Sequence, residues 1–182
     1  KTAYEIYQCD WSSDVCSSDL QPDARYVGVT GTNGKSTTTA LLGHVLARLG
    51  KPAQVGGNIG EPVLEFAPAA NGFYVIEMSS YQLELTHSLA FDVAILLNIT
   101  PDHLDRHGGM DGYVAAKRRI FRGQRRPQTA VIGVDDALSS RIHDDLRGVH
   151  AQIVIPISAA RAVEGGAFVV DGVLHDAIVE IG

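Results

Sequence analysis

The chain has 182 residues, a formal net charge of −6 at pH 7 and two cysteines. The acidic balance argues against a general nucleic-acid binder, and no apolar run approaches the roughly 20 residues that cross a bilayer. No secretory signal is visible, so we expect a cytoplasmic protein with no nucleic-acid or membrane partner.

The first twenty residues stand apart from the rest of the chain. The stretch WSSDVCSSDL (residues 11–20) is rich in Ser and Asp and too poor in apolar residues to order itself. Read back through the genetic code, residues 1–20 match the two ends of a common sequencing-library adapter, so we interpret them as a non-native, disordered segment. Both cysteines fall in it, and 182 minus 20 leaves 162 residues, about one domain.

Beyond that segment, short β-rich runs alternate with helical patterns. Strands are predicted at 26–30, 52–57, 73–78, 93–98 and 129–134, with helices over 35–50, 113–121 and 136–148. From Gln152 the pattern becomes β-rich, with runs at 152–157, 167–175 and 177–181 and a hairpin turn at Asp171-Gly172. The rhythm predicts an α/β fold, a mostly parallel sheet flanked by helices with a β-rich C-terminal edge.

The stretch GVTGTNGKST (residues 28–37) lies between a predicted strand and a predicted helix. Glycines turn successive N–H groups toward an anion, the helix N-terminus adds partial positive charge, Lys35 supplies a cation, and the Ser36 hydroxyl suits magnesium. The pattern departs from the general P-loop, because Val29 stands where that pattern has its first glycine. A ligand-free glycine-rich turn is the alternative, but the strand context and the Lys-Ser pair favour nucleotide binding.

Two further strands end in acidic or imidazole side chains. Glu77 ends one apolar run, and Asp102 and His103 follow another, so both groups are expected at the sheet edge where ligands of open sheets bind. A carboxylate there suits magnesium beside phosphates, although a charge simply emerging at the edge is the alternative. His107 is interpreted as a loop residue. The basic stretch KRRIFRGQRR (residues 117–126) is interpreted as a solvated helix end.

The loop TGTNGKST resembles the ATP loop of the Mur ligase and folylpolyglutamate synthetase superfamily. The segments VGGNIGEP, EMSSYQLE and NITPDHLDRHGGMDGYVAAKRRIF are similar to its D-glutamate-adding branch, and the resemblance covers residues 26 to about 150. It implies a central ATP-binding domain over residues 21–182, truncated at its C-terminal end. It also implies a monomeric, ATP-dependent ligase that joins D-glutamate to UDP-N-acetylmuramoyl-L-alanine through an acyl phosphate, in peptidoglycan precursor synthesis.

The same resemblance implies roles for individual residues, with ATP and two Mg²⁺ ions as cofactors. Nucleotide contacts fall to Gly31, Thr32, Asn33, Gly34, Lys35, Ser36 and Thr37. Substrate contacts fall to Asn58, Ser79 and Asp102, and metal contacts to Ser36, Glu77, His103 and Lys117. Lys35, His103 and Lys117 are the implied catalytic residues. Periodicity alone makes Lys117 one more basic helix residue, whereas the family's Y-R-A-A-K motif carries a carbamylated lysine.

Three alternatives stay open. A folylpolyglutamate synthetase or another Mur ligase shares the loop, and the acceptor and amino acid that stimulate phosphate release separate them. A non-catalytic nucleotide-binding switch has no use for the set Glu77, His103 and Lys117. Finally, the chain is expected to be truncated at both ends, so that alone it is inactive.

Overall fold

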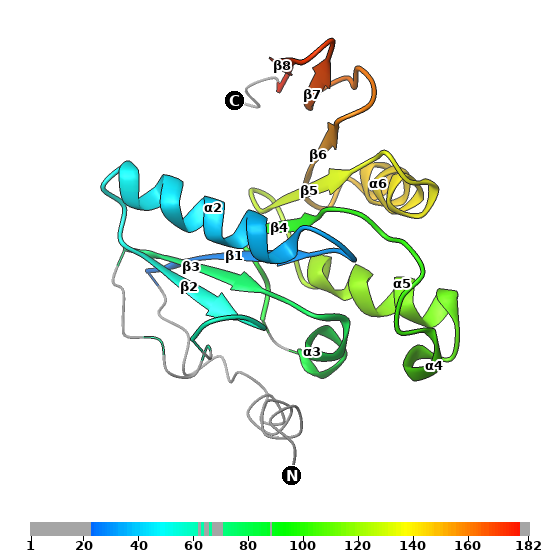
Figure 1. The fold of residues 1–182 in the computed structure, drawn as a ribbon, viewed down its shortest axis with the longest axis horizontal. Helices are drawn as coiled ribbons and strands as arrows, with labels where there is room; N and C mark the ends of the chain where they lie inside the picture. The colour runs from blue at the N-terminus through cyan, green and yellow to red at the C-terminus, as the bar shows by residue number, and fades with distance from the viewer. Residues whose placement is uncertain (1–22, 62, 64–65, 67–70, 88, 179–182) are drawn as a thin grey trace.

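The computed structural model describes residues 23–61, 63, 66, 71–87 and 89–178. The predictions for residues 1–20 therefore lie outside the described residues. Within them, the backbone forms one sheet of eight strands in the order β2-β3-β1-β4-β5-β6-β7-β8 (Figure 1). All neighbouring pairs are parallel except the last, which is antiparallel, so the predicted fold class is confirmed.

The elements follow the predicted alternation of strands and helices. The strands are β1 (Arg25–Thr30), β2 (Ala53–Gly57), β3 (Phe73–Glu77), β4 (Val93–Leu96), β5 (Thr129–Gly133), β6 (Ile153–Ser158), β7 (Ala167–Val170) and β8 (Val173–Asp176). The helices are α2 (Lys35–Arg48), α3 (Ser80–Leu85), α4 (Leu104–His107), α5 (Met110–Arg118), the short 3₁₀ helix η2 (Arg119–Phe121) and α6 (Ala137–Val149). None of the described helices is both long and apolar enough to span a membrane.

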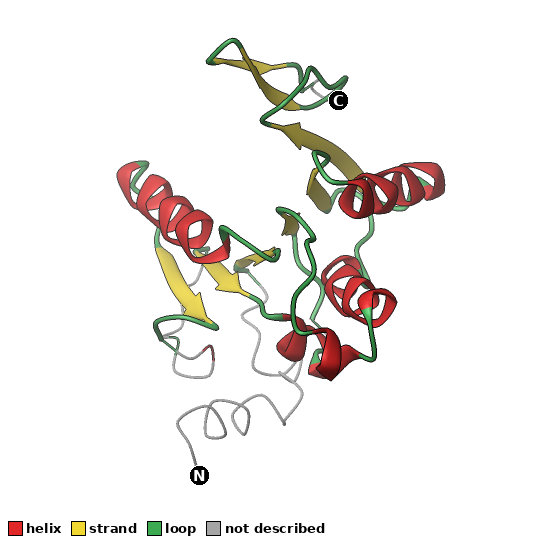
Figure 2. Cartoon of the chain, turned by 45° about the vertical axis from the view of Figure 1, so that its right-hand side comes forward, coloured by secondary structure: helices red, strands yellow, loops and turns green. Residues whose placement is uncertain are grey.

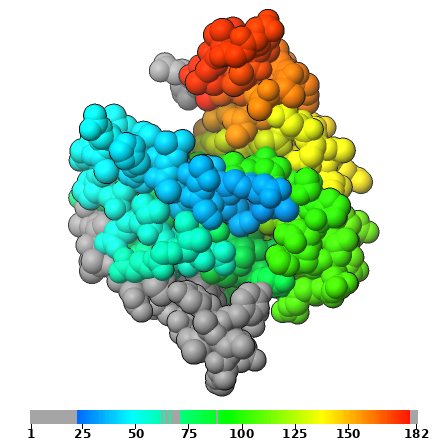
Figure 3. Space-filling view, in the orientation of Figure 1, coloured from blue at the N-terminus to red at the C-terminus, as the bar shows by residue number. Residues whose placement is uncertain are grey.

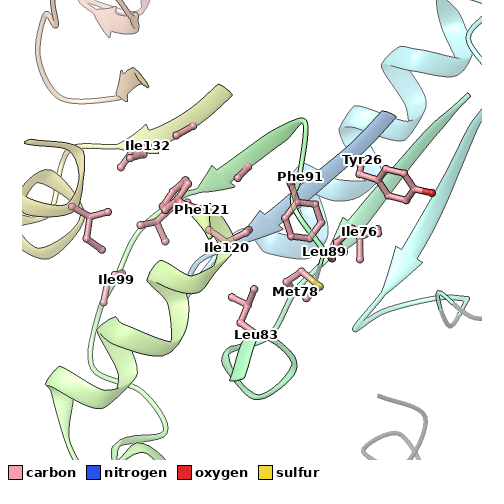
Figure 4. Packing of buried hydrophobic residues seen from close by; sticks show 14 of the residues in the cluster. Tyr26, Ile76, Met78, Leu83, Leu89, Phe91, Ile99, Ile120, Phe121 and Ile132 are labelled. Atoms are coloured by element: carbon pink, nitrogen blue, oxygen red, sulfur yellow. The ribbon is translucent and has the colours of Figure 1, made fainter. Parts of the chain in front are cut away.

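Helices cover the sheet from both sides (Figure 2). On one face, α2 packs Leu42 and Leu46 onto a cluster that includes Val29 and Val75. On the other face, α3, α5, η2 and α6 bury a larger cluster, part of which is drawn in Figure 4. Side chains alternate between the two faces along each strand, and this alternation supplies both clusters.

Gly28 in β1 shows how closely the larger cluster packs. A Cβ at this position would lie 2.8 Å from the ring of Phe91, which is buried against the strand. The missing side chain therefore makes room for the aromatic ring, and any larger residue would push it out of the core.

Parallel pairing brings the carboxyl ends of the central strands to one edge of the sheet. Val29 of β1 pairs with Glu77 of β3, and Thr30 pairs with Leu96 of β4. The connections that leave β1, β3 and β4 are consequently neighbours. This edge is where open α/β sheets bind ligands.

The C-terminal part confirms the predicted hairpin. Asp171 and Gly172 have φ of 51° and 75° and join β7 to the antiparallel β8. Positive φ at both central residues is typical of a type I′ turn. The hairpin extends from one end of the molecule (Figure 3). The strand predicted at 177–181 does not start within the described residues, because Ala177 and Ile178 lie in a loop, and the rest is outside them.

Two short helices were not predicted, and a third begins earlier than expected. The helix predicted over 113–121 begins at Met110 and tightens into η2 at Arg119. Helix α3 begins with a capping box, in which the Ser79 hydroxyl accepts from Gln82 N and the Gln82 side chain accepts from Ser79 N. Because this reciprocal pair satisfies N–H groups at the start of α3, six residues suffice to form a helix that begins three residues after Glu77.

Candidate functional site

Residues 31–34, here called the phosphate loop after the role predicted for them, join β1 to α2 at the edge of the sheet where open α/β sheets bind ligands. Gly34 precedes α2 with φ of 83°, a left-handed conformation that favours glycine. The first N–H groups of the helix have no partner within it and face the same edge as its positive dipole end. The side chain of Lys35 folds back and donates from Nζ to Thr32 O at 3.0 Å.

The residues that follow β4 form hydrogen bonds with this loop. Asn98 Oδ1 accepts from Asn33 N at 2.9 Å, and Asn98 Nδ2 donates to Asn33 O at 3.1 Å. The Thr32 hydroxyl accepts from Thr100 N at 3.0 Å and also lies 3.1 Å from the hydroxyl of Tyr113 on α5. Hydrogen bonds from two neighbouring elements thus fix Thr32 and Asn33.

Glu77 ends β3 with its side chain almost entirely buried, at 1% exposure. Asn58 Nδ2 donates to Glu77 Oε1 at 3.1 Å, and Asn58 N donates to Glu77 O at 3.0 Å. Glu77 Oε2 has no hydrogen-bond partner among the described residues. A buried carboxylate oxygen without a partner is costly, so its position points to a cation that the chain itself does not supply.

Lys117 is buried as well, at 2% exposure, although the next residue, Arg118, is exposed. Its Nζ donates to Gly31 O at 2.7 Å and lies 4.9 Å from the centre of the Tyr113 ring. The interpretation of residues 117–126 as a solvated helix end is therefore wrong for Lys117. It is wrong for Arg119 too, which donates to the carbonyls of Leu83 and Thr86.

The surroundings of Lys117 change its acidity. Burial, together with the positive charge of Lys35, lowers the pKa of the Lys117 amine to about 7, while Asp102 and Glu77 oppose the shift. These charges act on one another because the fold brings Lys35, Glu77, Asp102 and Lys117 to the same edge. A large fraction of the amine is therefore neutral, and nucleophilic, at neutral pH.

This shift predicts an unusual pH dependence of stability. Between about pH 7 and the ordinary lysine pKa of 10.5, the unfolded chain keeps a proton on Lys117 that the folded chain has lost. Its contribution to the free energy of unfolding therefore rises with pH in this window, by up to about 1.4 kcal/mol per unit, and below pH 7 the folded state bears the full cost of burying the ammonium. We expect Lys117→Met to be more stable than wild type at pH 6, with an advantage that shrinks by pH 9.

Chemical unfolding in carbon-dioxide-free buffers measures this difference. Lys51→Met, at an exposed position, serves as the control and should follow wild type at every pH. A Lys117→Met advantage that stays constant from pH 6 to pH 9 would contradict the lowered pKa.

Asp102 and His103 lie in the connection from β4 to α4, as the sequence predicted. His103 precedes α4 with φ of 50°, and its Nε2 lies 3.4 Å from Asp102 Oδ2. Its ring lies against Tyr81 of α3, with ring centres 5.2 Å apart. The His103 side chain is 49% exposed, so it can reach a ligand at this edge.

His107 is not a simple loop residue, and that interpretation is wrong. It ends α4 with a fully buried side chain, whose Nδ1 lies 2.8 Å from Glu84 Oε1 and whose Nε2 lies 3.0 Å from the Ser80 hydroxyl. The ring also stacks on Tyr81, which contacts His103. His107 therefore joins α4 to α3, the helices that follow Glu77 and His103.

A cavity of about 660 Å³ opens beside the phosphate loop. The residues that line it include Asn33, Gly34, Thr38, Asn98, Asp136 and Phe168. A second cavity, of about 480 Å³, lies at the opposite ends of the strands, between Arg25 and Arg125, and contains none of the predicted site residues. Of the two, only the cavity beside the loop can receive the rest of a nucleotide whose phosphates lie on the loop.

The residues at this edge can bind magnesium with carboxylate and hydroxyl oxygens, together with the phosphates of a nucleotide. The described residues contain no ready group of three His, Cys, Asp or Glu side chains. The unpartnered oxygen of Glu77 and the exposed Ser36 hydroxyl are suitable hard ligands, and the phosphates of a nucleotide complete such sites. Ser79 lies two residues after Glu77 in the sequence, and its hydroxyl caps α3.

Sequence reasoning missed Asn98, Thr100 and Tyr113, all of which contact the loop. A signal was present for Asn98, because it follows β4, the neighbour of β1, at the same edge where the strand-end rule placed Glu77. Tyr113 carried no such signal, since an aromatic residue on a helix is usually a core residue. Its contact with Thr32 depends on how α5 packs.

Comparison with known proteins gives consistent results. A sequence model described as the Mur ligase middle domain matches residues 29–168. The UDP-N-acetylmuramoylalanine--D-glutamate ligase of Rhodospirillum rubrum is 56% identical over 167 residues, which cover 89% of this chain and 35% of that protein. The protein of the same name from Caulobacter vibrioides is 54% identical over 157 residues, which cover 86% of this chain and 33% of its own length.

Solved structures show the same fold at low sequence identity. A UDP-N-acetylmuramoyl-L-alanyl-D-glutamate--2,6-diaminopimelate ligase superimposes with a TM-score of 0.65 and 22% identity, over 85% of this chain and 36% of the other. The chain spans about a third of the length of the curated relatives it matches.

Proposed function

Because the chain belongs to the Mur ligase family, we propose that the protein containing it is an ATP-dependent ligase that joins D-glutamate to UDP-N-acetylmuramoyl-L-alanine. The high identity to relatives named as D-glutamate ligases supports this branch over the folate enzymes and the other Mur ligases. The reaction belongs to peptidoglycan precursor synthesis. We also propose a monomeric, cytoplasmic enzyme with small-molecule substrates.

One observation carries the proposal at the level of the site. A phosphate loop with Lys35, a buried carboxylate oxygen of Glu77 without a partner, and a buried Lys117 whose pKa is about 7 meet at one edge of the sheet. A nucleotide-binding switch also needs the loop and can use a carboxylate such as Glu77 for magnesium, but it has no use for a buried lysine that can form a carbamate ligand. Their combination supports ATP-driven group transfer.

In the proposed reaction, the terminal phosphoryl group of ATP passes to the L-alanyl carboxylate, giving ADP and an acyl phosphate. The amine of D-glutamate then attacks the acyl carbon, a new amide bond forms, and phosphate leaves. No protein nucleophile is needed, so the chain contributes positioning and charge neutralisation. Lys35 and the loop N–H groups would hold the transferred phosphoryl group. Asn58, Ser79 and Asp102 would contact the muramoyl substrate.

Two magnesium ions are proposed as cofactors, with Ser36, Glu77, His103 and Lys117 as the residues that would hold them. When bound, magnesium neutralises phosphate charge and orients the transferred group. Lys117 is proposed to react as the neutral amine with carbon dioxide, which forms an N–C bond and releases a proton. The product is an anionic carbamate, which would serve as an oxygen ligand.

Nucleotide binding by the 182-residue chain tests the site directly. We expect ATP with magnesium to bind the wild-type chain in a calorimetric titration, and Lys35→Ala to bind at least about tenfold more weakly, because one cation at the phosphates is lost. Lys51→Ala, which removes an exposed lysine just beyond α2, should bind like wild type. Equal affinities for wild type and Lys35→Ala would overturn the nucleotide site.

A further inference from the structure

Asp136 uses its two carboxylate oxygens for different purposes. It precedes α6 directly, and its Oδ1 accepts from Leu138 N at 3.1 Å and from Ser139 N at 2.8 Å, which caps the helix. Its Oδ2 accepts from Ile99 N at 3.0 Å, in the connection that leaves β4. The first contact is an ordinary helix cap. The second joins the end of β5 to the end of β4.

Ile99 lies between the two residues that hold the phosphate loop. Asn98 makes the paired hydrogen bonds to Asn33, and its backbone carbonyl accepts from Thr32 N at 2.9 Å. Thr100 exchanges hydrogen bonds with the Thr32 hydroxyl. A continuous series of hydrogen bonds therefore runs from the start of α6, through residues 98–100, to the loop.

The loop depends on such support because its own sequence does not fix its shape. Glycine has wide conformational freedom, and the loop has glycines at positions 31 and 34, on either side of Thr32 and Asn33. The contacts that Thr32 and Asn33 make with residues 98–100 select one conformation from many. A site preformed in this way binds its ligand without the entropic cost of ordering.

We propose that Asp136 is a positioning residue for the phosphate loop, acting through residues 98–100. The inference rests on the proposed nucleotide site and adds to it a residue that need not touch the nucleotide. A hydrogen bond that an ionised carboxylate accepts is stronger than a neutral one, so Asp suits this position better than the other common cap residues.

Asp136→Asn separates the two roles. Asparagine caps helices about as well as aspartate, so its single oxygen can keep the two bonds to α6. Its NH₂ group then faces the N–H of Ile99, and two donors cannot bond. We expect the amides of Thr32 and Asn33 to exchange hydrogen faster in the ligand-free chain, and ATP with magnesium to bind roughly tenfold more weakly.

The direction of the affinity change is informative by itself. Asp136 lines the cavity beside the loop, so removing its negative charge should, by charge alone, strengthen the binding of an anionic nucleotide. Weaker binding therefore identifies loss of positioning. Asp144→Asn, on the exposed side of α6, removes the same charge and can keep its contact with His143, and it should match wild type in both measurements.

A double-mutant cycle with Asn98→Ala tests whether Asp136 acts on the phosphate loop through residues 98–100. If Asp136 acts through residues 98–100, the two substitutions together should weaken binding clearly less than the product of their separate effects, whereas independent sites give that product. Unchanged Thr32 and Asn33 exchange, or equal or tighter ATP binding by Asp136→Asn, would overturn the inference. Should the wild-type chain bind no nucleotide, the proposed nucleotide site fails, and exchange in the ligand-free chain still decides the role of Asp136.

Discussion

Lys117→Ala, made in the intact gene product that contains this chain, is expected to lower turnover on the order of a thousandfold. The substitution removes the amine that donates to Gly31 O, beneath the phosphate loop, and with it the proposed carbamate ligand. A small carboxylate such as formate or acetate should restore part of the activity, because it can occupy the vacated space and supply the same anionic oxygens. Phosphate release at saturating ATP measures both effects.

Two further variants separate this role from an effect on folding. Lys117→Met keeps most of the side-chain volume, and it should be folded yet as inactive as the alanine variant. Arg118→Ala alters the next residue, whose side chain pairs with Asp145 on the surface, and it should stay close to wild type. Full activity in Lys117→Ala would reject the role of the lysine, and an inactive but folded variant that no carboxylate rescues would reject the carbamate.

Glu77→Gln should lower turnover by about a hundredfold or more while leaving the chain at least as stable as wild type. The glutamine oxygen can still accept from Asn58, so the local hydrogen bond survives. The buried oxygen without a hydrogen-bond partner is replaced by an uncharged group, which removes the cost of burying a charge there. The magnesium concentration needed for half-maximal turnover should rise in the same variant.

Thermal unfolding of the chain measures its stability, and a magnesium titration of turnover measures the magnesium concentration needed for half-maximal activity. Glu164→Gln, on the distant connection between β6 and β7, makes the same chemical change at an exposed position and should alter neither quantity. If Glu77 had only a structural role, its loss would lower stability and leave the magnesium requirement unchanged.

The fold was largely predictable because its signals are local. Apolar runs such as FYVIE bounded by turn residues predict buried strands, and the Asp171-Gly172 pair predicts a hairpin, which the structure confirms. The helix α3 was missed because six residues are too few to show a helical period, although Ser79 and Gln82 carried the spacing of a capping box.

The site was predictable only where a residue's place in a strand or loop determines its surroundings. The position of Glu77 was predictable because it ends a strand, and that of Lys35 because it belongs to the glycine-rich loop motif. The burial of Lys117 and His107 does not, because their partners come from distant parts of the chain: Gly31 for the first, and Ser80 and Glu84 for the second. Composition around them is basic or polar, and composition alone therefore predicts solvent exposure.

The most direct test of the central claim is phosphate release by the intact gene product with ATP, magnesium and UDP-N-acetylmuramoyl-L-alanine. The amino acids offered would be D-glutamate, L-glutamate, L-alanine and L-lysine, each separately. The account predicts release with D-glutamate and no stimulation by the other three. Stimulation by another amino acid instead, or by none of the four, would contradict the assignment to the D-glutamate-adding branch.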